Sequence, residues 1–464
     1  MHQFGNDVKV EHGRVTLVNE AVLQTEAMDE LVREAVFGQG QTKDHAQWLL
    51  WEIGQAAGVR PSSIHDFYLA RGEGKTHGFT VPAINVRGMA YDTARAVFRT
   101  AVKQKAGAFV VEIARSEIAY TDQRPREYVA VMLAAALREG FRGPLFVQGD
   151  HFQVNAKKFA VDRRGEVAAV KQLAQEAIAS GFFNIDVDTS TLVDVSLATL
   201  DEQQRLNYQT AVDITRYIRE IQPDGITISV GGEIGEVGAH NSTVPELRAF
   251  MDGFNATLKE RSGAAVDGLS KISVQTGTSH GGVVLPDGTI AAVKLDLPAL
   301  EELSKVARTD YGMAGAVQHG ASTLPDNAFN NFPRVEACEI HLATNFQNIL
   351  YDHMPDALRS RIYTWLDENA KEERKPKDSD EQFYYKTRKK ALGPFKRDIW
   401  DMPASVKSEL ATAYDQTFGF LFEQLRVSNT ADTVARFVKA PTMHRAPGAP
   451  VAVHAAPDDA EAGE

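Results

Sequence analysis

Short apolar runs alternate with helical stretches eight times between residues 79 and 345, and this repetition limits the possible fold more than any other feature of the chain. Each run has the length of a buried strand and is followed by a segment with helical periodicity. Eight such units predict an α/β fold, a closed parallel (β/α)8 TIM barrel. The rival is an open doubly wound sheet, but no Gly-x-Gly-x-x-Gly turn follows the first run. The expected strands lie at 81–86, 108–113, 144–147, 182–187, 226–230, 272–274, 316–317 and 338–342.

The remaining segments suggest additions to this barrel. We expect a helical N-terminal extension at 1–75, the barrel domain at 76–350 and a charged, helical C-terminal extension at 351–440. Residues 441–464 are rich in alanine, proline and acidic residues, a composition that predicts disorder. Asp287 and Gly288, flanked by β-branched residues, predict a hairpin inserted after the sixth strand.

Composition argues against several classes of function. The formal net charge is −12, and an acidic protein is a poor partner for the phosphate backbone of nucleic acids. No apolar stretch reaches the ~18 residues of a membrane span, and the N-terminus lacks the basic-then-apolar order of a signal peptide. The single cysteine, Cys338, excludes an internal disulfide. These features fit a cytoplasmic protein without a membrane or nucleic-acid partner.

Three histidines stand where apolar runs end, and together they predict a metal site. His151 follows the third run, while His280 and His319 follow the sixth and seventh. The carboxyl ends of barrel strands share one face, so these side chains should meet at the mouth. Catalytic zinc typically uses three protein ligands and keeps one position open. A single histidine in such a place is more often structural, but three at one end favour a metal.

Acidic residues and small residues accompany the histidines. Asp150 could transfer a proton beside the metal, or cap a helix or orient a ligand instead. Asp186 and Glu233 are candidate oxygen ligands or partners of ligands, and their alternative is ion pairing with Lys or Arg. Small residues and a hydroxyl near His280 and His319 could present donors to a phosphate, although helix capping is also compatible. These are Gly281, Gly320 and Ser322.

The order and spacing of these motifs resemble those of the class II, metal-dependent fructose-bisphosphate aldolases. The likeness extends from about residue 79 to residue 345 and includes the opening strand at 81–86, the Asp150–His151 pair and the segment 232–238. It implies zinc bound by His151, His280 and His319, with Asp186 and Glu233 as further ligands or holders of a second cation. It also implies that Asp150 is the proton-transfer residue. The implied substrate contacts are Asn85, Gly281, Gly320, Ser322, His341 and Thr344.

The resemblance implies reversible cleavage of a ketose phosphate, such as fructose 1,6-bisphosphate, to dihydroxyacetone phosphate and an aldehyde. It also implies a homo-oligomer, a dimer or tetramer. The chain departs from the family pattern at several substrate contacts. His341 stands where the family has a substrate-binding Asn, and residues 112–117 differ from the usual second-strand motif. Arg115 is a candidate replacement anion contact. A different ketose phosphate, a non-phosphorylated sugar, or a non-catalytic aldolase-like subunit therefore remain as alternatives.

Overall fold

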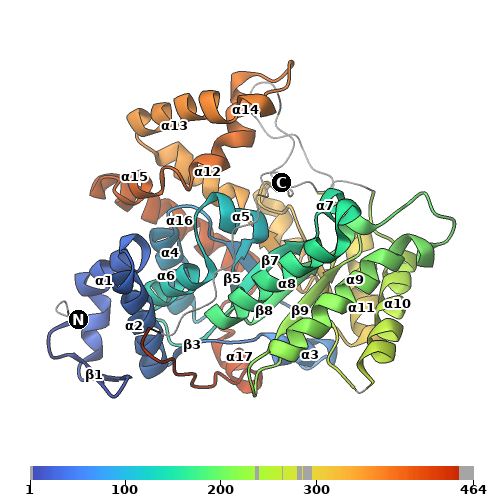
Figure 1. Cartoon of the computed structure of the whole chain (residues 1–464), viewed down its shortest axis with the longest axis horizontal. Coiled ribbons are helices and arrows are strands. Elements are labelled where there is room, and N and C mark those ends of the chain that lie inside the picture. Colours follow the sequence, from blue (N-terminus) through green and yellow to red (C-terminus); the bar gives the residue numbers. More distant parts are fainter. Residues whose placement is uncertain (1–3, 236–239, 264, 279–284, 286–294, 449–464) are drawn as a thin grey trace.

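The computed structural model describes residues 4–235, 240–263, 265–278, 285 and 295–448 (Figure 1). Eight strands form a closed barrel in the order β10-β11-β12-β4-β5-β7-β8-β9, and every neighbouring pair with a printed register is parallel. The predicted TIM barrel is therefore confirmed. Its strands are β4 (Val81–Asn85), β5 (Val110–Ala114), β7 (Val147–Gln153), β8 (Asn184–Asp188), β9 (Ser229–Glu233), β10 (Lys271–Val274), β11 (Ala316–Gln318) and β12 (Glu339–Leu342).

Helices cover the outside of this barrel, as the alternating pattern requires. Local residues determine where two of these helices begin. Thr199 and Glu202 form a capping box at the N-terminus of the long helix after β8, and Thr243 and Glu246 form one at the N-terminus of the helix after β9. In each case a side chain satisfies backbone N–H groups that the first turn leaves without partners. The helices are α4 (Ala90–Gln104), α5 (Arg115–Tyr120), α6 (Pro125–Arg138), α7 (Ala156–Val161), α8 (Arg163–Ser180), α9 (Leu200–Ile221), α10 (Val244–Ser262), α11 (Leu297–Tyr311) and α12 (Thr344–His353).

The N-terminal segment is less helical than its sequence predicts. It contains α1 (Glu26–Phe37), α2 (Gln41–Ala57) and α3 (His65–Gly72), but also the antiparallel hairpin of β1 (Val8–Glu11) and β2 (Arg14–Leu17). His12 and Gly13 turn this hairpin with φ values of 51° and 72°, which suits a tight two-residue connection. A further short strand, β3 (Val59–Pro61), pairs with β6 (Gly143–Leu145) outside the barrel.

The α3 segment closes the end of the barrel where the strands begin. The hydroxyl of Tyr68 donates a hydrogen bond to Glu339 on β12. The backbone N–H of Ile64 donates to the Asn184 side chain at the start of β8. These bonds satisfy polar groups that the barrel would otherwise bury unpaired. The open end of the barrel is therefore the one where the strands finish.

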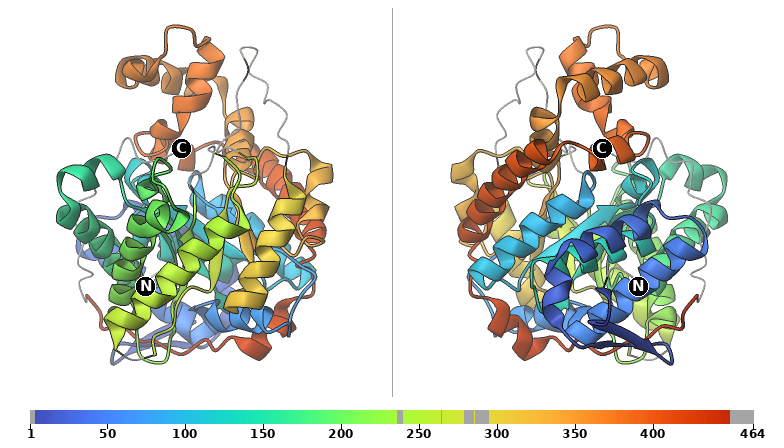
Figure 2. Two further views of the ribbon diagram at one scale, coloured as in Figure 1. Left: turned by 90° about the vertical axis from the view of Figure 1, so that its right-hand side faces the viewer. Right: turned by 90° about the vertical axis from the view of Figure 1, so that its left-hand side faces the viewer.

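The C-terminal helices stand at that open end. Figure 2 shows α13 (Asp356–Asn369) and α14 (Asp380–Thr387) projecting beyond the barrel. The chain then returns through α15 (Lys396–Trp400) to α16 (Ala404–Gln424), which packs on α4 and α12, and to α17 (Ala431–Phe437) beside α3. Gly393 N–H donates to the Tyr120 carbonyl at the end of α5, which ties this segment to the helix after β5.

The start of the tail, which we expected to be disordered, packs against α2. The indole N–H of Trp48 donates to the Arg445 carbonyl at 2.9 Å, and His444 Nδ1 lies 2.7 Å from the buried carboxylate of Glu52. The Arg445 guanidinium lies over the Trp51 ring at 3.2 Å from its centroid, a cation–π contact. Composition missed these contacts because they depend on partners almost 400 positions earlier in the chain.

The hairpin expected after the sixth strand falls mostly on residues 286–294, which lie outside the described residues. In the described part of the chain, no helix has the length and apolar character required to traverse a lipid bilayer.

Candidate metal and proton-transfer site

Asp150 and His151 both reach the barrel interior because β7 contains an irregularity at that point. The register with β8 shifts between Gly149 and Phe152, and His151 has a φ of 38°. Successive side chains of a regular strand point to opposite faces, so a regular β7 would send one of the two outward. A bulge re-aims side chains in this way and is common next to active sites. β7 is also longer than predicted, since it continues to Gln153.

His151 faces two carboxylates from the next two strands. Its Nδ1 lies 3.0 Å from Asp188 Oδ2 at the end of β8 and 3.0 Å from Glu233 Oε1 at the end of β9. Asp188 is fully buried and also accepts hydrogen bonds from Gln153 and Ser190. A carboxylate held in this way orients an imidazole and sets its tautomer.

His319 lies beside His151 and extends the cluster across the mouth. The two ring centroids are 4.4 Å apart, and the His319 ring is 4.0 Å from that of His341 on β12. His319 Nε2 lies 3.0 Å from Ser273 Oγ and 3.4 Å from Glu233 Oε1. Two of the three predicted zinc histidines therefore converge. The third, His280, lies outside the described residues.

His341 is surrounded by carboxylates on both sides of its ring. Nδ1 lies 3.1 Å from Glu112 Oε1 and 3.2 Å from Asp150 Oδ1, while Nε2 is 2.8 Å from Glu339 Oε1. Burial alone would lower the pKa of His341, but Glu112 and Asp150 outweigh it and raise the pKa. Carboxyl groups thus face both ring nitrogens of His341, and one of them belongs to Asp150.

Asp186, a predicted ligand, is held by a lysine. The Lys271 ammonium on β10 donates to Asp186 at 2.9 Å, Glu339 at 2.5 Å and Gln148 at 2.8 Å. Gly231 lies between the acid and the lysine in the barrel, and a Cβ there would be 2.2 Å from Asp186 Oδ1. The ion-pair alternative noted for Asp186 is thus the arrangement observed. The ammonium lies between Asp186 and Glu339, and these two carboxylates with His341 also form a group close enough to hold a metal ion.

The upper part of the barrel interior concentrates negative charge. Burial raises the pKa of Glu112 to about 8, with the Asp150 carboxylate adding to the shift. Burial also raises the pKa of Glu233 to about 7, and Asp188 contributes. Burial by itself lowers the pKa of His151, but Asp150 and Glu233 outweigh it and raise that pKa. A divalent cation would relieve this accumulation of buried carboxylates.

The donor set fits such a cation. One donor atom from each of His151, Glu233 and His319 lies within 4.8 Å of the others. Glu233 Oε1 is buried and has no hydrogen bond of acceptable geometry, although it is close to both rings. Two imidazoles and one glutamate form a ligand set that catalytic zinc uses in other enzymes. A second group, Asp150, His319 and His341, meets the same distance criterion.

The predicted substrate contacts are distributed around this centre, with their polar groups partly engaged. Asn85 is buried, and its amide donates to Glu117 at 2.5 Å. Ser322 accepts a hydrogen bond from the Ala343 N–H at 2.5 Å. Thr344 lies 3.5 Å from an Arg87 nitrogen. Gly320 follows His319 with a φ of 65°, and Gly281 is outside the described residues.

Two arginines near the mouth are paired with carboxylates. Arg115, the candidate anion contact, donates to Glu166 at 2.7 Å and to the Gln153 carbonyl at 2.5 Å. Arg87, after β4, lies 2.7 Å from Glu117. Arg115 thus has an internal partner for its buried charge, and its contact with a substrate anion stays a prediction. A substrate phosphate receives little support from these two residues.

Sequence reasoning missed several residues of this site. Asp188, Glu112 and Glu339 are buried there, as is Lys271, and none of them was assigned a role from the sequence, although Asp188 directly follows the fourth expected strand. One signal was present: Asp186 and Asp188 are two positions apart on one strand, so they share a face. A second signal was Lys271, a lysine within an apolar strand, because a buried lysine needs carboxylate partners.

The comparisons with known proteins agree with the fold. The model of the family described as fructose-bisphosphate aldolase class-II matches residues 72–398. No curated protein matches the sequence significantly. Among solved structures, a probable tagatose 6 phosphate kinase from Sinorhizobium meliloti is 15% identical, with a TM-score of 0.51, and the match covers 77% of this chain and 98% of that chain.

Two further structures are similar in extent. A putative fructose-1,6-biphosphate aldolase from Coccidioides immitis is 15% identical, with a TM-score of 0.48, over 79% of this chain and 96% of that chain. The fructose-bisphosphate aldolase of Campylobacter jejuni is 16% identical, with a TM-score of 0.46, over 80% and 97%. The likeness to the Sinorhizobium meliloti structure, at 15% identity and a TM-score of 0.51, concerns the fold alone. The family match covers more than half of the chain and coincides with the barrel and its converging histidines, so this protein belongs to the class II fructose-bisphosphate aldolase family.

Proposed function

We propose that this protein is a zinc-dependent aldolase that reversibly cleaves a ketose phosphate into a three-carbon ketone phosphate and an aldehyde. The single observation that carries the proposal is the convergence of His151, His319 and Glu233 on one point at the barrel mouth, with Asp150 beside it. The family match supports aldol chemistry, and the donor set supports a divalent metal. His280 is the third proposed histidine ligand, because its sequence segment resembles a zinc-histidine segment of the family.

The residues of this site have distinct tasks in the proposal. A bound divalent metal would act as a Lewis acid on the ketose carbonyl and stabilise negative charge on oxygen during the reaction. Asp150 removes the proton from the hydroxyl whose carbon becomes the aldehyde, as the carbon–carbon bond breaks, and returns it in the reverse direction. His341 holds the Asp150 carboxylate in place from 3.2 Å. Asp188 holds the His151 ring at 3.0 Å.

A ketose with one phosphate, or with none, is a second candidate substrate, and the pairing of two arginines near the mouth favours it. Arg87 and Arg115 are both ion-paired to buried glutamates, so neither is available to a phosphate without losing its partner. A ketose with one phosphate, or a sugar with none, would need fewer cations at the mouth than a bisphosphate. His341 in place of the amide expected from the family also changes the contacts offered to the sugar.

The decisive experiment is an aldol-cleavage assay on a panel of substrates. Fructose 1,6-bisphosphate, fructose 1-phosphate, tagatose 1,6-bisphosphate and unphosphorylated fructose should be compared with and without a chelator, and bound metal should be counted on the same preparation. We expect about one tightly bound divalent ion per chain and cleavage that the chelator abolishes and zinc restores. Cleavage that survives complete metal removal would exclude the proposal. A protein without bound metal and without activity would favour a non-catalytic subunit.

A further inference from the structure

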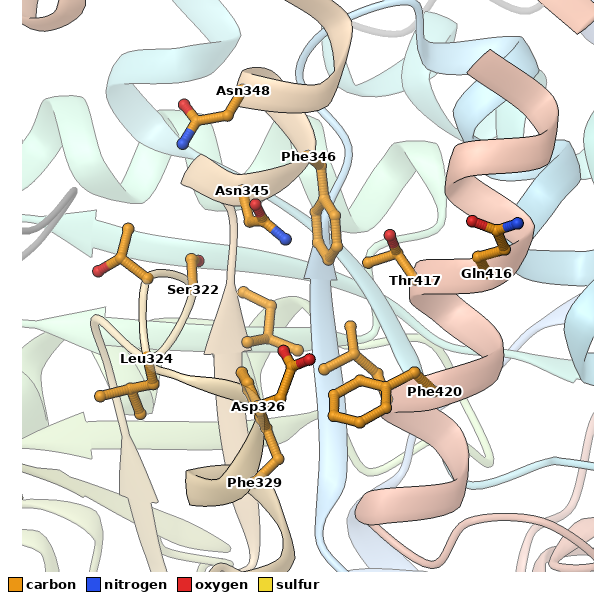
Figure 3. Close-up of a pocket in the computed structure, with 13 residues that line it drawn as sticks. Ser322, Leu324, Asp326, Phe329, Asn345, Phe346, Asn348, Gln416, Thr417 and Phe420 are labelled. Atoms are coloured by element: carbon orange, nitrogen blue, oxygen red, sulfur yellow. The ribbon is translucent and has the colours of Figure 1, made fainter. Parts of the chain in front are cut away.

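A cavity of about 510 Å³ lies between the barrel wall and the C-terminal helix α16. Figure 3 shows Asn345 and Phe346 at the start of α12, facing Thr417 and Phe420 on α16. The segment from Ser322 to Phe329, after β11, forms a further side. Small-molecule sites usually measure ~300–1,000 Å³. The cavity is therefore large enough for a metabolite-sized ligand.

This cavity lies on the other side of β12 from the proposed metal site, although Ser322, an expected substrate contact, lines it as well. Leu342 lines it, whereas the preceding residue, His341, lies inside the barrel against Asp150 and Glu112. Consecutive side chains of a strand point to opposite faces, so β12 stands between the two spaces. The hydrogen bond from Ala343 N–H to Ser322 Oγ connects the chain after β12 to the loop after β11 at the same level. A ligand in the cavity would not touch the metal-site residues.

The lining combines aromatic faces with uncharged polar groups. Phe329 and Phe420 meet edge to face with centroids 6.1 Å apart, and Phe346 stands opposite. Thr323 Oγ1 is buried and has no hydrogen-bond partner, and the half-buried Asn345 also lines the cavity. Buried polar groups normally find partners. Thr323 therefore offers a hydrogen bond that a ligand can complete, and the Asn345 amide is available at the cavity edge for another.

Charge decides which ligands suit this lining. Among its described residues there is no lysine, arginine or histidine, and the one ionisable residue is Asp326. A phosphate or carboxylate would find no counter-charge here and would face the carboxylate of Asp326 instead, which is unfavourable. Aromatic rings accept the apolar face of a ligand, while Asn and Thr accept and donate to hydroxyl groups. The chemistry therefore favours an uncharged molecule with one flat apolar part and several hydroxyls.

We propose that this cavity is a second ligand site, which binds an uncharged small molecule that joins an aromatic ring to a hydroxylated part, as an aryl glycoside does. The bound molecule bridges α16 of the C-terminal segment to α12 and the loop after β11. It therefore stabilises the packing of that segment on the barrel. The proposal is independent of the aldolase reaction, because it requires neither metal nor ketose.

The test uses the full-length protein and two matched probes. Phenyl β-D-glucopyranoside is uncharged, and phenyl phosphate carries the same ring on an anion. Saturation-transfer NMR reports whether each probe binds, and the melting temperature reports stabilisation by binding. We expect transfer to both the ring and the sugar protons of the glucoside, a higher melting temperature with it, and no comparable effect of phenyl phosphate.

Two threonines of α16 provide a matched pair of variants. The Thr417 and Thr412 hydroxyls each donate to the carbonyl four residues earlier, at 2.9 and 3.0 Å. Thr417 lines the cavity, whereas Thr412 is exposed elsewhere on the helix. Thr417→Trp should fill the cavity and abolish glucoside binding, while Thr412→Trp should keep it. Asn345→Leu, which keeps the side-chain size but removes the amide, should weaken binding about tenfold.

The results of these binding experiments distinguish a ligand in this cavity from a ligand bound elsewhere on the protein. Absence of glucoside binding to the unmodified protein would overturn the proposal. Equal binding by the unmodified protein and by Thr417→Trp would place the probe elsewhere, the barrel mouth included, and would also overturn it. Binding of phenyl phosphate as strong as that of the glucoside would contradict the argument from charge. If Thr417→Trp does not fold by circular dichroism, the Asn345→Leu result decides instead.

Discussion

Nδ1 of His341 lies 3.2 Å from Oδ1 of Asp150, and each residue is only 5% exposed. The two come from β12 and β7, which are not neighbours in the barrel, so the contact crosses its interior. On its other side the His341 ring is held by Glu339, which Lys271 and Tyr68 fix in turn. Asp150, the proposed proton-transfer residue, is therefore positioned through His341 by a chain of buried hydrogen-bonded groups.

Removal of this contact should slow the reaction without removal of the metal. In His341→Asn the carboxylate of Asp150 loses the imidazole nitrogen that lies 3.2 Å away, and its orientation is no longer held. We expect kcat to fall by about 10- to 100-fold, as for the loss of an orienting partner, with an altered KM because the ring also lines the sugar site in the proposal. Steady-state kinetics and metal analysis check this. Unchanged kcat and KM with every ketose would show that His341 has no such role.

Asp150 itself should matter more than its partner. Asp150→Asn keeps the shape of the side chain but cannot accept the substrate proton, so kcat should fall by about 10²- to 10⁴-fold. Bound metal should stay near the level of the unmodified protein, because His151, His319 and Glu233 remain. The two measurements belong on the same preparation. Loss of metal together with activity would instead identify Asp150 as a ligand.

Lys271 should be essential for stability because it neutralises two buried carboxylates. Lys271→Met leaves Asp186 and Glu339 buried without their ammonium, and removal of one partner of a buried pair costs about 3–5 kcal/mol. Urea unfolding measures the loss. Lys305→Met on the exposed side of α11 is the control and should change stability by less than about 0.5 kcal/mol. The double variant Lys271→Met with Glu339→Gln should recover part of the loss, and equal stability of Lys271→Met and the control would refute the argument.

His65, at the start of α3, should make the protein sensitive to acid. Burial, with a smaller contribution from Arg219, lowers the pKa of His65 from 6.5 to about 4. Between these two values His65 is protonated in the unfolded chain but neutral in the folded protein. The free energy of unfolding therefore declines as pH falls from about 6.5 to about 4. The full effect is about 3 kcal/mol for a shift of this size. Above pH 6.5 this group should contribute no pH dependence.

A pair of variants isolates that effect. His65→Gln removes the titrating group, so the fall in unfolding free energy between pH 7 and pH 5 should become smaller. His45→Gln removes an exposed histidine of α2 and should leave the fall unchanged. Urea unfolding at the two pH values gives the comparison. An identical pH dependence in all three proteins would show that His65 does not limit stability in acid.

The sequence alone determined the barrel and the neighbourhood of its site. Eight apolar runs separated by helical periodicity leave few alternatives to a closed parallel barrel, because each run must be buried and each helix must cover it. The strand order then brings the ends of the third, fifth and seventh strands to one face, so His151, Glu233 and His319 were predicted correctly as neighbours. Hydrophobic periodicity depends only on residues that are close in sequence, so it can be read from one sequence without knowledge of the tertiary contacts.

Only the tertiary structure decided which charges meet. Whether Asp150 and His151 both face inward depended on a bulge in β7. The ion pair of Asp186 depended on Lys271, which lies 85 positions later in the chain. Arg115 and the tail from Met443 to Arg445 found partners in the same way, at Glu166 and on α2. Pairing energies depend on distance and burial, and these are set by packing between segments that are remote in sequence.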